Sequence, residues 1–161
     1  MKRIAIIGAG GHGREVAEIL AQQAAQMGAF TVQGFIDENK ERHGQWIDGL
    51  PVLGDWDWVA ANKDGLAVIC AVGTPAVMRL LVARAQALGI PFANAISPLA
   101  HVSPRATLGE GVSARACSGS APRLSCTACN IVGSSPASLA LLVSSAATMM
   151  CAASSTAVCA L

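Results

Sequence analysis

The 161-residue sequence predicts an α/β fold, in which a small Rossmann-like domain with a parallel sheet precedes the first coil of a left-handed parallel β-helix. An irregular or disordered tail is expected after that coil. Two patterns support this prediction. Short apolar runs alternate with amphipathic stretches up to about residue 95, an order that gives parallel strands with right-handed crossovers. From Ile96 onward, aliphatic residues recur every six positions, which is typical of a parallel β-helix. We therefore divide the chain into residues 1–95, 96–113 and 114–161.

The first division contains the expected strands and helices of the sheet domain. The strands are short apolar runs, and they are predicted at residues 3–7, 31–36, 50–54, 66–72 and 92–96. The helices show one apolar face or a capping signal, and they are predicted at residues 14–27, 55–61 and 76–88. Gly28 and Gly89 follow the two longer helices as terminators, and Pro75 suits a first helical turn. The polar stretch 39–49 is expected to be a loop.

The second division carries the six-residue period. The aliphatic positions are followed four residues later by smaller side chains, and the three pairs are Ile96 and Ala100, Val102 and Ala106, Leu108 and Val112. Pro98, Pro104 and Gly109 fall where tight corners are expected. Three strips of six residues make one full coil of a triangular helix, and one coil does not bury its own ends.

Composition changes sharply at Ser113. All acidic residues and histidines precede it, whereas 27 of the 48 later residues are Ala, Ser or Cys. Our hypothesis is that residues 114–161 form an aberrant tail. They would be encoded by a shifted reading frame of the gene segment that should encode the rest of the β-helix. Cys126 and Cys129 have C-x-x-C spacing, but no second pair or histidine accompanies them, so we expect no metal.

Charge and composition also restrict the expected partners. The formal net charge is +1 and tyrosine is absent, so neither nucleic acid nor a membrane is an expected partner. The apolar run at residues 4–7 is too short for a signal peptide. We therefore expect a cytoplasmic protein whose six cysteines remain reduced.

A glycine-rich turn carries the main functional prediction. Gly8, Gly10 and Gly13 have G-x-G-x-x-G spacing between a predicted strand and a predicted helix, where free N–H groups favour phosphate. Glycines that merely ease a sharp turn are the alternative. His12 lies inside this turn and could donate to a phosphate or sugar oxygen, or it could simply be exposed in a polar loop.

Acids and a further glycine fall at the same predicted edge of the sheet. Asp37 and Glu38 end the second strand, where a carboxylate can bind a ribose hydroxyl or can remain a solvated acid pair. Gly73 follows the third buried strand, where it would permit close approach of a ligand or simply make a turn.

Four motifs together resemble the NeuD/PglD-type sugar acetyltransferase family over residues 2–113. They are Gly8-Ala9-Gly10-Gly11-His12-Gly13, Phe35-Ile36-Asp37-Glu38, Leu50-Pro51-Val52-Leu53-Gly54 and Ile96-Ser97-Pro98-Leu99-Ala100-His101-Val102. The resemblance implies a nucleotide-sugar-binding domain, a trimer assembled through the β-helix, and acetyl-CoA bound between neighbouring helices. It implies that Gly10, Gly11, His12 and Gly13 line the sugar-nucleotide pocket and that Asp37 lies near the nucleoside.

The resemblance does not supply a catalytic residue. Its general base is a histidine of the β-helix, and no histidine follows His101 in this sequence. We therefore leave the catalytic residues unknown and expect little or no acetyl transfer from this chain. Two alternatives remain open, a fragment of an NAD-binding oxidoreductase and a nucleotide-sugar-binding module without catalysis.

Overall fold

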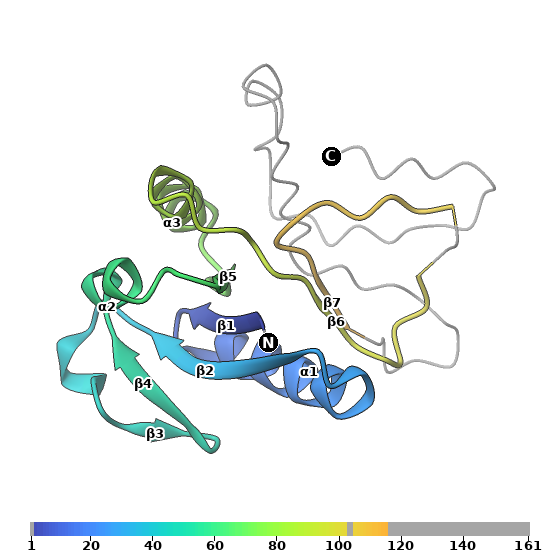
Figure 1. Cartoon of the computed structure of the whole chain (residues 1–161), viewed down its shortest axis with the longest axis horizontal. Coiled ribbons are helices and arrows are strands. Elements are labelled where there is room, and N and C mark those ends of the chain that lie inside the picture. The colour runs from blue at the N-terminus through green and yellow to red at the C-terminus, as the bar shows by residue number, and fades with distance from the viewer. Residues whose placement is uncertain (1, 103–104, 116–161) are drawn as a thin grey trace.

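The fold is a five-stranded sheet covered by helices on both faces, as seen in a computed structural model that describes residues 2–102 and 105–115 (Figure 1). The strands are β1 (Lys2–Ile7), β2 (Phe30–Ile36), β3 (Trp46–Ile47), β4 (Leu50–Gly54), β5 (Leu66–Cys70), β6 (Ala95–Ile96) and β7 (Ser113–Ala114). The helices are α1 (Gly11–Met27), α2 (Trp56–Ala61) and α3 (Pro75–Ala87), with a 3-10 turn η1 (Lys40–Arg42). The sheet order is β3-β4-β2-β1-β5. The predicted α/β class is confirmed.

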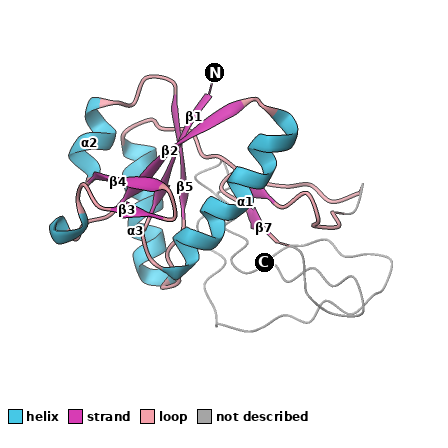
Figure 2. Ribbon diagram, turned by 90° about the horizontal axis from the view of Figure 1, so that it is seen from below, coloured by secondary structure: helices cyan, strands magenta, loops and turns pink. Residues whose placement is uncertain are grey.

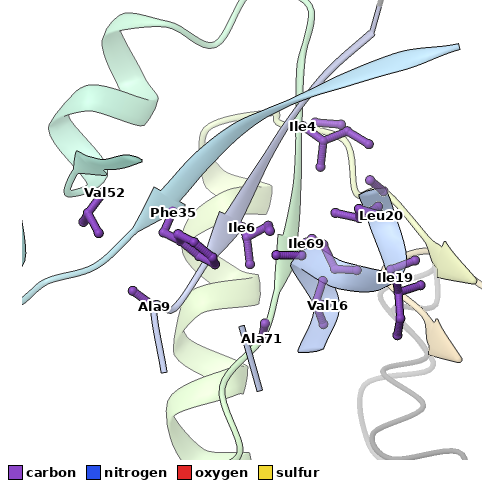
Figure 3. Packing of buried hydrophobic residues seen from close by; sticks show 14 residues of the cluster. Ile4, Ile6, Ala9, Val16, Ile19, Leu20, Phe35, Val52, Ile69 and Ala71 are labelled. Atoms are coloured by element: carbon purple, nitrogen blue, oxygen red, sulfur yellow. The ribbon is translucent and has the colours of Figure 1, made fainter. Parts of the chain in front are cut away.

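Two hydrophobic clusters form the core, one on each face of the sheet. In β1, Ile4 and Ile6 belong to the cluster that contains the apolar face of α1, whereas Ala5 and Ile7 belong to the cluster that contains α2 and α3. Figure 3 shows residues of the first cluster packed together between sheet and helix. Because both faces are covered, the strand sequence is continuously apolar rather than alternating. Figure 2 shows the helices on the two sides of the sheet.

The predicted helix boundaries are largely confirmed. Gly28 ends α1 with the left-handed φ of 59°, and its N–H donates to the Ala24 carbonyl. The Asp55 side chain accepts from the Asp57 N–H at the start of α2, and Pro75 opens α3. However, α1 begins at Gly11, three residues before its predicted start, so the last part of the glycine-rich turn is already helical.

The prediction of a loop over residues 39–49 is wrong, because this stretch contains η1 and β3. Strand β3 pairs antiparallel with β4, with Trp46 opposite Pro51 and Ile47 opposite Leu50. Asp48 and Gly49 form the connection, with φ of 49° and 81°. Two consecutive positive φ values are those of a type I′ turn, for which Asp-Gly is a preferred sequence.

The predicted boundaries of two later strands are also corrected. β5 ends at Cys70 rather than at Val72. The predicted strand 92–96 is split, because Phe92 forms a single parallel bridge with Val68 of the sheet, and the chain then leaves the sheet. Ala95 and Ile96 pair instead with β7.

Strands β6 and β7 are parallel, and Ala95 pairs with Ser113, 18 residues later. Three strips of six residues would give this spacing. The N–H groups of Ala95 and Ser97 donate to the carbonyls of Val112 and Ala114, each at 2.8 Å. That this segment begins a left-handed β-helix stays a prediction, as do the three divisions of the chain.

The other edge of β6 faces α1. Successive N–H groups of a strand point to opposite sides, so the N–H of Ile96 points away from β7. It donates to Oε1 of Gln23 at 3.3 Å. Helix α1 therefore covers the edge of β6 that β7 leaves free.

The Asn94 side chain closes the segment between β6 and β7. Its Nδ2 donates to the Gly109 carbonyl and its Oδ1 accepts from the Val112 N–H, both at 2.9 Å.

Replacing Asn94 with alanine leaves two partly buried backbone groups without these partners. We expect the free energy of unfolding to fall by about 2 kcal/mol in urea titrations. Asn39→Ala removes one exposed bond to the Glu41 N–H and should lower it by less than about 1 kcal/mol. Equal effects of the two changes would contradict this role for Asn94.

The predicted irregular tail, including Cys126 and Cys129, lies outside the described residues. Within residues 2–102 and 105–115, none of the helices has the length and apolar character needed to cross a membrane.

Candidate functional site at the carboxyl edge of the sheet

The site lies where the order of the strands reverses. β1 is paired with β2 on one side and β5 on the other, both parallel, and ligands of such sheets bind outside the carboxyl ends at this point. The glycine-rich turn follows β1, and Gly73 follows β5. The Gly8 N–H donates to the Ile36 carbonyl at 2.7 Å, and the Ala71 N–H donates to the Ile7 carbonyl at 2.8 Å. The ends of all three strands are therefore tied together beneath the site.

Two glycines of the turn are required by the fold itself. Gly8 has a φ of 107°, and a Cβ there would lie 2.9 Å from the Ala71 carbonyl oxygen. A Cβ on Gly13 would overlap the carbonyl oxygen of Gly8. The absence of side chains at Gly8 and Gly13 therefore lets the strand, the turn and the helix pack closely.

Three other glycines border open space. Apart from the adjoining residues and the nearby helix backbone, no atom lies within 4 Å of a Cβ built on Gly10, Gly11 or Gly73. Gly10 has a φ of −83° and a ψ of −170°, an extended conformation open to most residues. The fold itself thus does not require glycine at these positions, and their missing side chains keep the start of α1 accessible.

The start of α1 offers unpaired backbone donors. The helix has 17 residues, Gly10 is its N-cap, and neither a capping side chain nor a first-turn acid is present. The first N–H groups of a helix have no partner within it, and the helix dipole places partial positive charge there. This arrangement suits a phosphate group.

His12 lies in the first turn of α1, and its side chain is only 18% exposed. Its Nδ1 lies 3.5 Å from Oε2 of Glu15, one turn along the helix. The structure thus places the predicted histidine within the turn, and it adds a carboxylate partner that the sequence analysis did not single out.

Asp37 fastens the glycine-rich turn to the end of β2. One carboxylate oxygen accepts from the Ala9 N–H at 3.2 Å, and the other accepts from the Asn39 N–H at 2.9 Å. Glu38 lies elsewhere, with its carboxylate 3.5 Å from Nη1 of Arg84 on α3. The structure therefore brings Asp37 to the turn but not Glu38. A role of either acid toward a nucleoside stays a prediction.

Two polar residues beside the turn, Arg42 and His43, were not predicted from the sequence. Nη1 of Arg42 lies 3.3 Å from the Ala9 carbonyl and 3.4 Å from Asp37, and Nε2 of His43 lies 2.8 Å from the Asp37 carbonyl. Both belong to the stretch expected to be a loop, where no periodic pattern marks individual residues.

A bidentate ion pair joins α1 to the β3–β4 hairpin. The Arg14 guanidinium donates to the two carboxylate oxygens of Asp48 at 2.6 and 3.0 Å. These hydrogen bonds lower the pKa of Asp48 and raise that of Arg14. Both groups are exposed, so the pair orients the hairpin more than it stabilises the fold.

The site is an open edge rather than an enclosed cavity. A hollow of about 400 Å³ lies instead at the amino ends of the strands beside Lys2 and Lys63, and one of about 220 Å³ lies beside Trp56 and Arg84. Among residues 2–102 and 105–115, no three His, Cys, Asp or Glu side chains lie close enough together to hold a metal ion.

Cys70 ends β5 next to the site, yet its thiol is buried. Burial raises its pKa to about 12, from an ordinary value of 9.0. We expect Cys70 to resist alkylation at pH 8 in the native chain and to react in urea, as measured by peptide mass mapping. The raised pKa also gives stability that is fully present below pH 9 and is lost as pH rises towards 12. Rapid native alkylation of Cys70 would contradict its burial.

The fold, with its parallel strands and the reversal of strand order at β1, is that of a Rossmann-like α/β domain. The model of the PglD N-terminal domain family matches residues 3–85. The chain belongs to this family, and over this segment it resembles the NeuD/PglD-type sugar acetyltransferases, as expected from the sequence. A comparison with the curated proteins found no match.

Solved structures agree with this membership. The acetyltransferase domain of PglB from Neisseria gonorrhoeae is 31% identical with a TM-score of 0.57, and the similarity covers 70% of this chain and 53% of that one. PerB from Caulobacter crescentus, solved with CoA and GDP-perosamine, is 33% identical with a TM-score of 0.58, covering 70% and 51%. The chain thus spans about half the length of these structures.

Proposed function

We propose that the chain binds a nucleotide-linked amino sugar at the edge between β1 and β5, as the substrate-binding part of an acetyl-CoA-dependent sugar acetyltransferase. The observation that carries the proposal is the open start of α1. Gly10, Gly11 and Gly73 leave space that the fold does not need, next to backbone donors that no side chain caps. A diphosphate fits such donors, and the rest of the ligand would extend across the edge.

The solved relatives support the choice of ligand. PerB was solved with CoA and GDP-perosamine, and the PglB domain was solved with acetyl coenzyme A. For the acetyltransferase of which this domain would be part, we propose a nucleotide-linked amino sugar as acceptor and acetyl-CoA as co-substrate, whereas from this chain, in which no histidine follows His101, we expect little or no acetyl transfer. A homotrimer with acetyl-CoA between neighbouring copies, and a cytoplasmic location where acetyl-CoA is supplied, complete the proposal.

Within the site, each residue has a proposed role. The N–H groups that follow Gly10 would hold the diphosphate, and His12 would contact the sugar or a phosphate oxygen. Asp37 would act mainly by fixing the turn, since its two oxygens already accept backbone N–H groups. Arg42 adds positive charge beside the turn, although its guanidinium is shared with Asp37 and the Ala9 carbonyl.

Calorimetric titration of the purified chain tests the proposal. A UDP-linked amino sugar and GDP-perosamine are the ligands, and NADH is the comparison. Binding of a sugar nucleotide without binding of NADH supports the proposal, whereas binding of NADH alone would favour the oxidoreductase alternative. Release of free CoA from acetyl-CoA in the presence of the sugar nucleotide would separate an acetyltransferase from a module that only binds.

A further inference from the structure

One carboxylate joins the glycine-rich turn to the segment after β7. Oε2 of Glu15 lies 3.5 Å from Nδ1 of His12, and Oε1 of the same carboxylate lies 3.0 Å from Nη1 of Arg115. His12 and Arg115 are 103 positions apart in the sequence. Glu15 therefore contacts two parts of the molecule that the sequence alone does not relate.

The fold fixes both sides of this contact. Positions three apart on a helix lie on the same face, so α1 places Glu15 beside His12. Arg115 follows β7 directly, and β7 is held by its parallel pairing with β6. β6 is in turn bonded to α1 through Gln23 and the Ile96 N–H. Closure of the segment between β6 and β7 thus brings Arg115 to α1.

Stability is not the main consequence of these contacts. The side chains of Glu15 and Arg115 are 49% and 44% exposed, and exposed ion pairs of this kind contribute about 0–1 kcal/mol. Their more relevant feature is that they place a carboxylate beside one nitrogen of the His12 ring, whose side chain is only 18% exposed.

A carboxylate at one ring nitrogen of histidine determines what the other nitrogen offers. A neutral imidazole carries one donor nitrogen and one acceptor nitrogen, and a carboxylate only accepts. With Glu15 at Nδ1, the proton is favoured on Nδ1, and Nε2 is left as the acceptor. The group of a ligand that meets Nε2 must then be a donor, such as a sugar hydroxyl or an amine, and not a phosphate oxygen.

We propose that Glu15 is a positioning residue for His12, held in place by Arg115, and that it makes Nε2 of His12 an acceptor for a hydroxyl or amine of the bound sugar. This inference rests on the proposed function and deepens it, because it assigns His12 to the sugar rather than to the diphosphate. It also makes the start of the segment after β7 part of the sugar-nucleotide site.

Nitrogen NMR of the imidazole rings tests the first step without any ligand. In the full chain we expect His12 to carry its proton mainly on Nδ1, and in Glu15→Gln we expect a shift towards the Nε2–H form. The spectrum of His12→Asn identifies the signal among the three histidines. Glu18→Gln, which changes an exposed acid one turn further along α1, is the matched control and should leave the His12 signal unchanged. An unchanged His12 signal in Glu15→Gln would overturn the proposal.

Affinity for the sugar nucleotide tests the second step. We expect Glu15→Gln to weaken binding by roughly three- to tenfold, and Arg115→Gln to weaken it less. The double variant should lose no more than Glu15→Gln alone, because both changes act through His12. A tautomer shift without loss of affinity would overturn the assignment of His12 to the sugar. If the unmodified chain binds no sugar nucleotide, the proposed function fails, whereas the NMR result still decides whether Glu15 positions His12.

Discussion

Gly13→Ala is expected to destabilise the domain by about 3 kcal/mol, a large part of the 5–15 kcal/mol that typically holds a domain together. The added methyl would overlap the Gly8 carbonyl oxygen, and Gly8 is itself held by the hydrogen bond from its N–H to the Ile36 carbonyl at 2.7 Å. The start of α1 would have to move away from β1, loosening the packing of Val16 and Leu20 against the sheet. Urea unfolding followed by circular dichroism measures the loss.

Gly11→Ala is the matched control for this prediction. It adds the same methyl two residues earlier in the same turn, where no atom lies within 4 Å. Its stability should equal or exceed that of the unmodified chain, with a gain of at most about 1 kcal/mol. A Gly13→Ala variant as stable as Gly11→Ala would show that the turn relaxes without cost.

Gly10→Val is expected to abolish most sugar-nucleotide binding while leaving the fold intact. The extended backbone of Gly10 accepts a β-branched residue, and the surrounding space is free of protein atoms. The branched side chain would occupy the space in which a diphosphate approaches the first N–H groups of α1. We expect a loss of affinity of at least about tenfold, equivalent to 1.4 kcal/mol, in the calorimetric titration.

The control for Gly10→Val introduces the same side chain far from the site. Ala87→Val changes an exposed residue at the last position of α3, and it should alter neither affinity nor stability by much. If Gly10→Val binds as tightly as Ala87→Val, the ligand does not approach the glycine-rich turn. That result would refute the position of the site, even if the chain binds a sugar nucleotide elsewhere.

Local sequence signals predicted most of the sheet domain. The apolar run before the glycine-rich turn, the amphipathic stretch after it and the terminator Gly28 are contained within about thirty residues, and all three are found in the structure. The same holds for the cap at Asp55 and for Pro75 at the start of α3. Such signals suffice because the neighbouring residues that determine each boundary are close in sequence.

Features that depend on distant partners were not predicted. The run 92–96 is uniformly apolar, but Phe92 meets Val68 while Ala95 meets Ser113, and nothing in its composition marks the division. β3 has only two residues, so it shows no periodicity. The Asp48-Gly49 pair between Ile47 and Leu50 was the one signal that could have revealed the hairpin.

In the candidate site, too, local signals were predicted correctly and contacts between distant residues were not. G-x-G-x-x-G spacing located the turn, but it could not separate the glycines that the fold requires from those that border open space. For Gly8 that separation depends on Ala71, which follows β5 on the other side of β1, and for Gly13 it depends on the Gly8 carbonyl. The sequence likewise could not show that the oxygens of Asp37 are used by Ala9 and Asn39, because an acid at a strand end has the same pattern in either role.

The hydrogen bond between Gln23 and the Ile96 N–H restricts where another strand can pair with β6. An exposed strand edge recruits any strand that can pair with it, including one from another copy of the same chain. Because α1 covers one side of β6, the coils of the predicted β-helix would add beyond β7, and the covered edge of β6 is less open to pairing with a second chain. Helix α1, whose first turn borders the proposed ligand site, therefore also covers one edge of the β6–β7 pair through Gln23, three turns along.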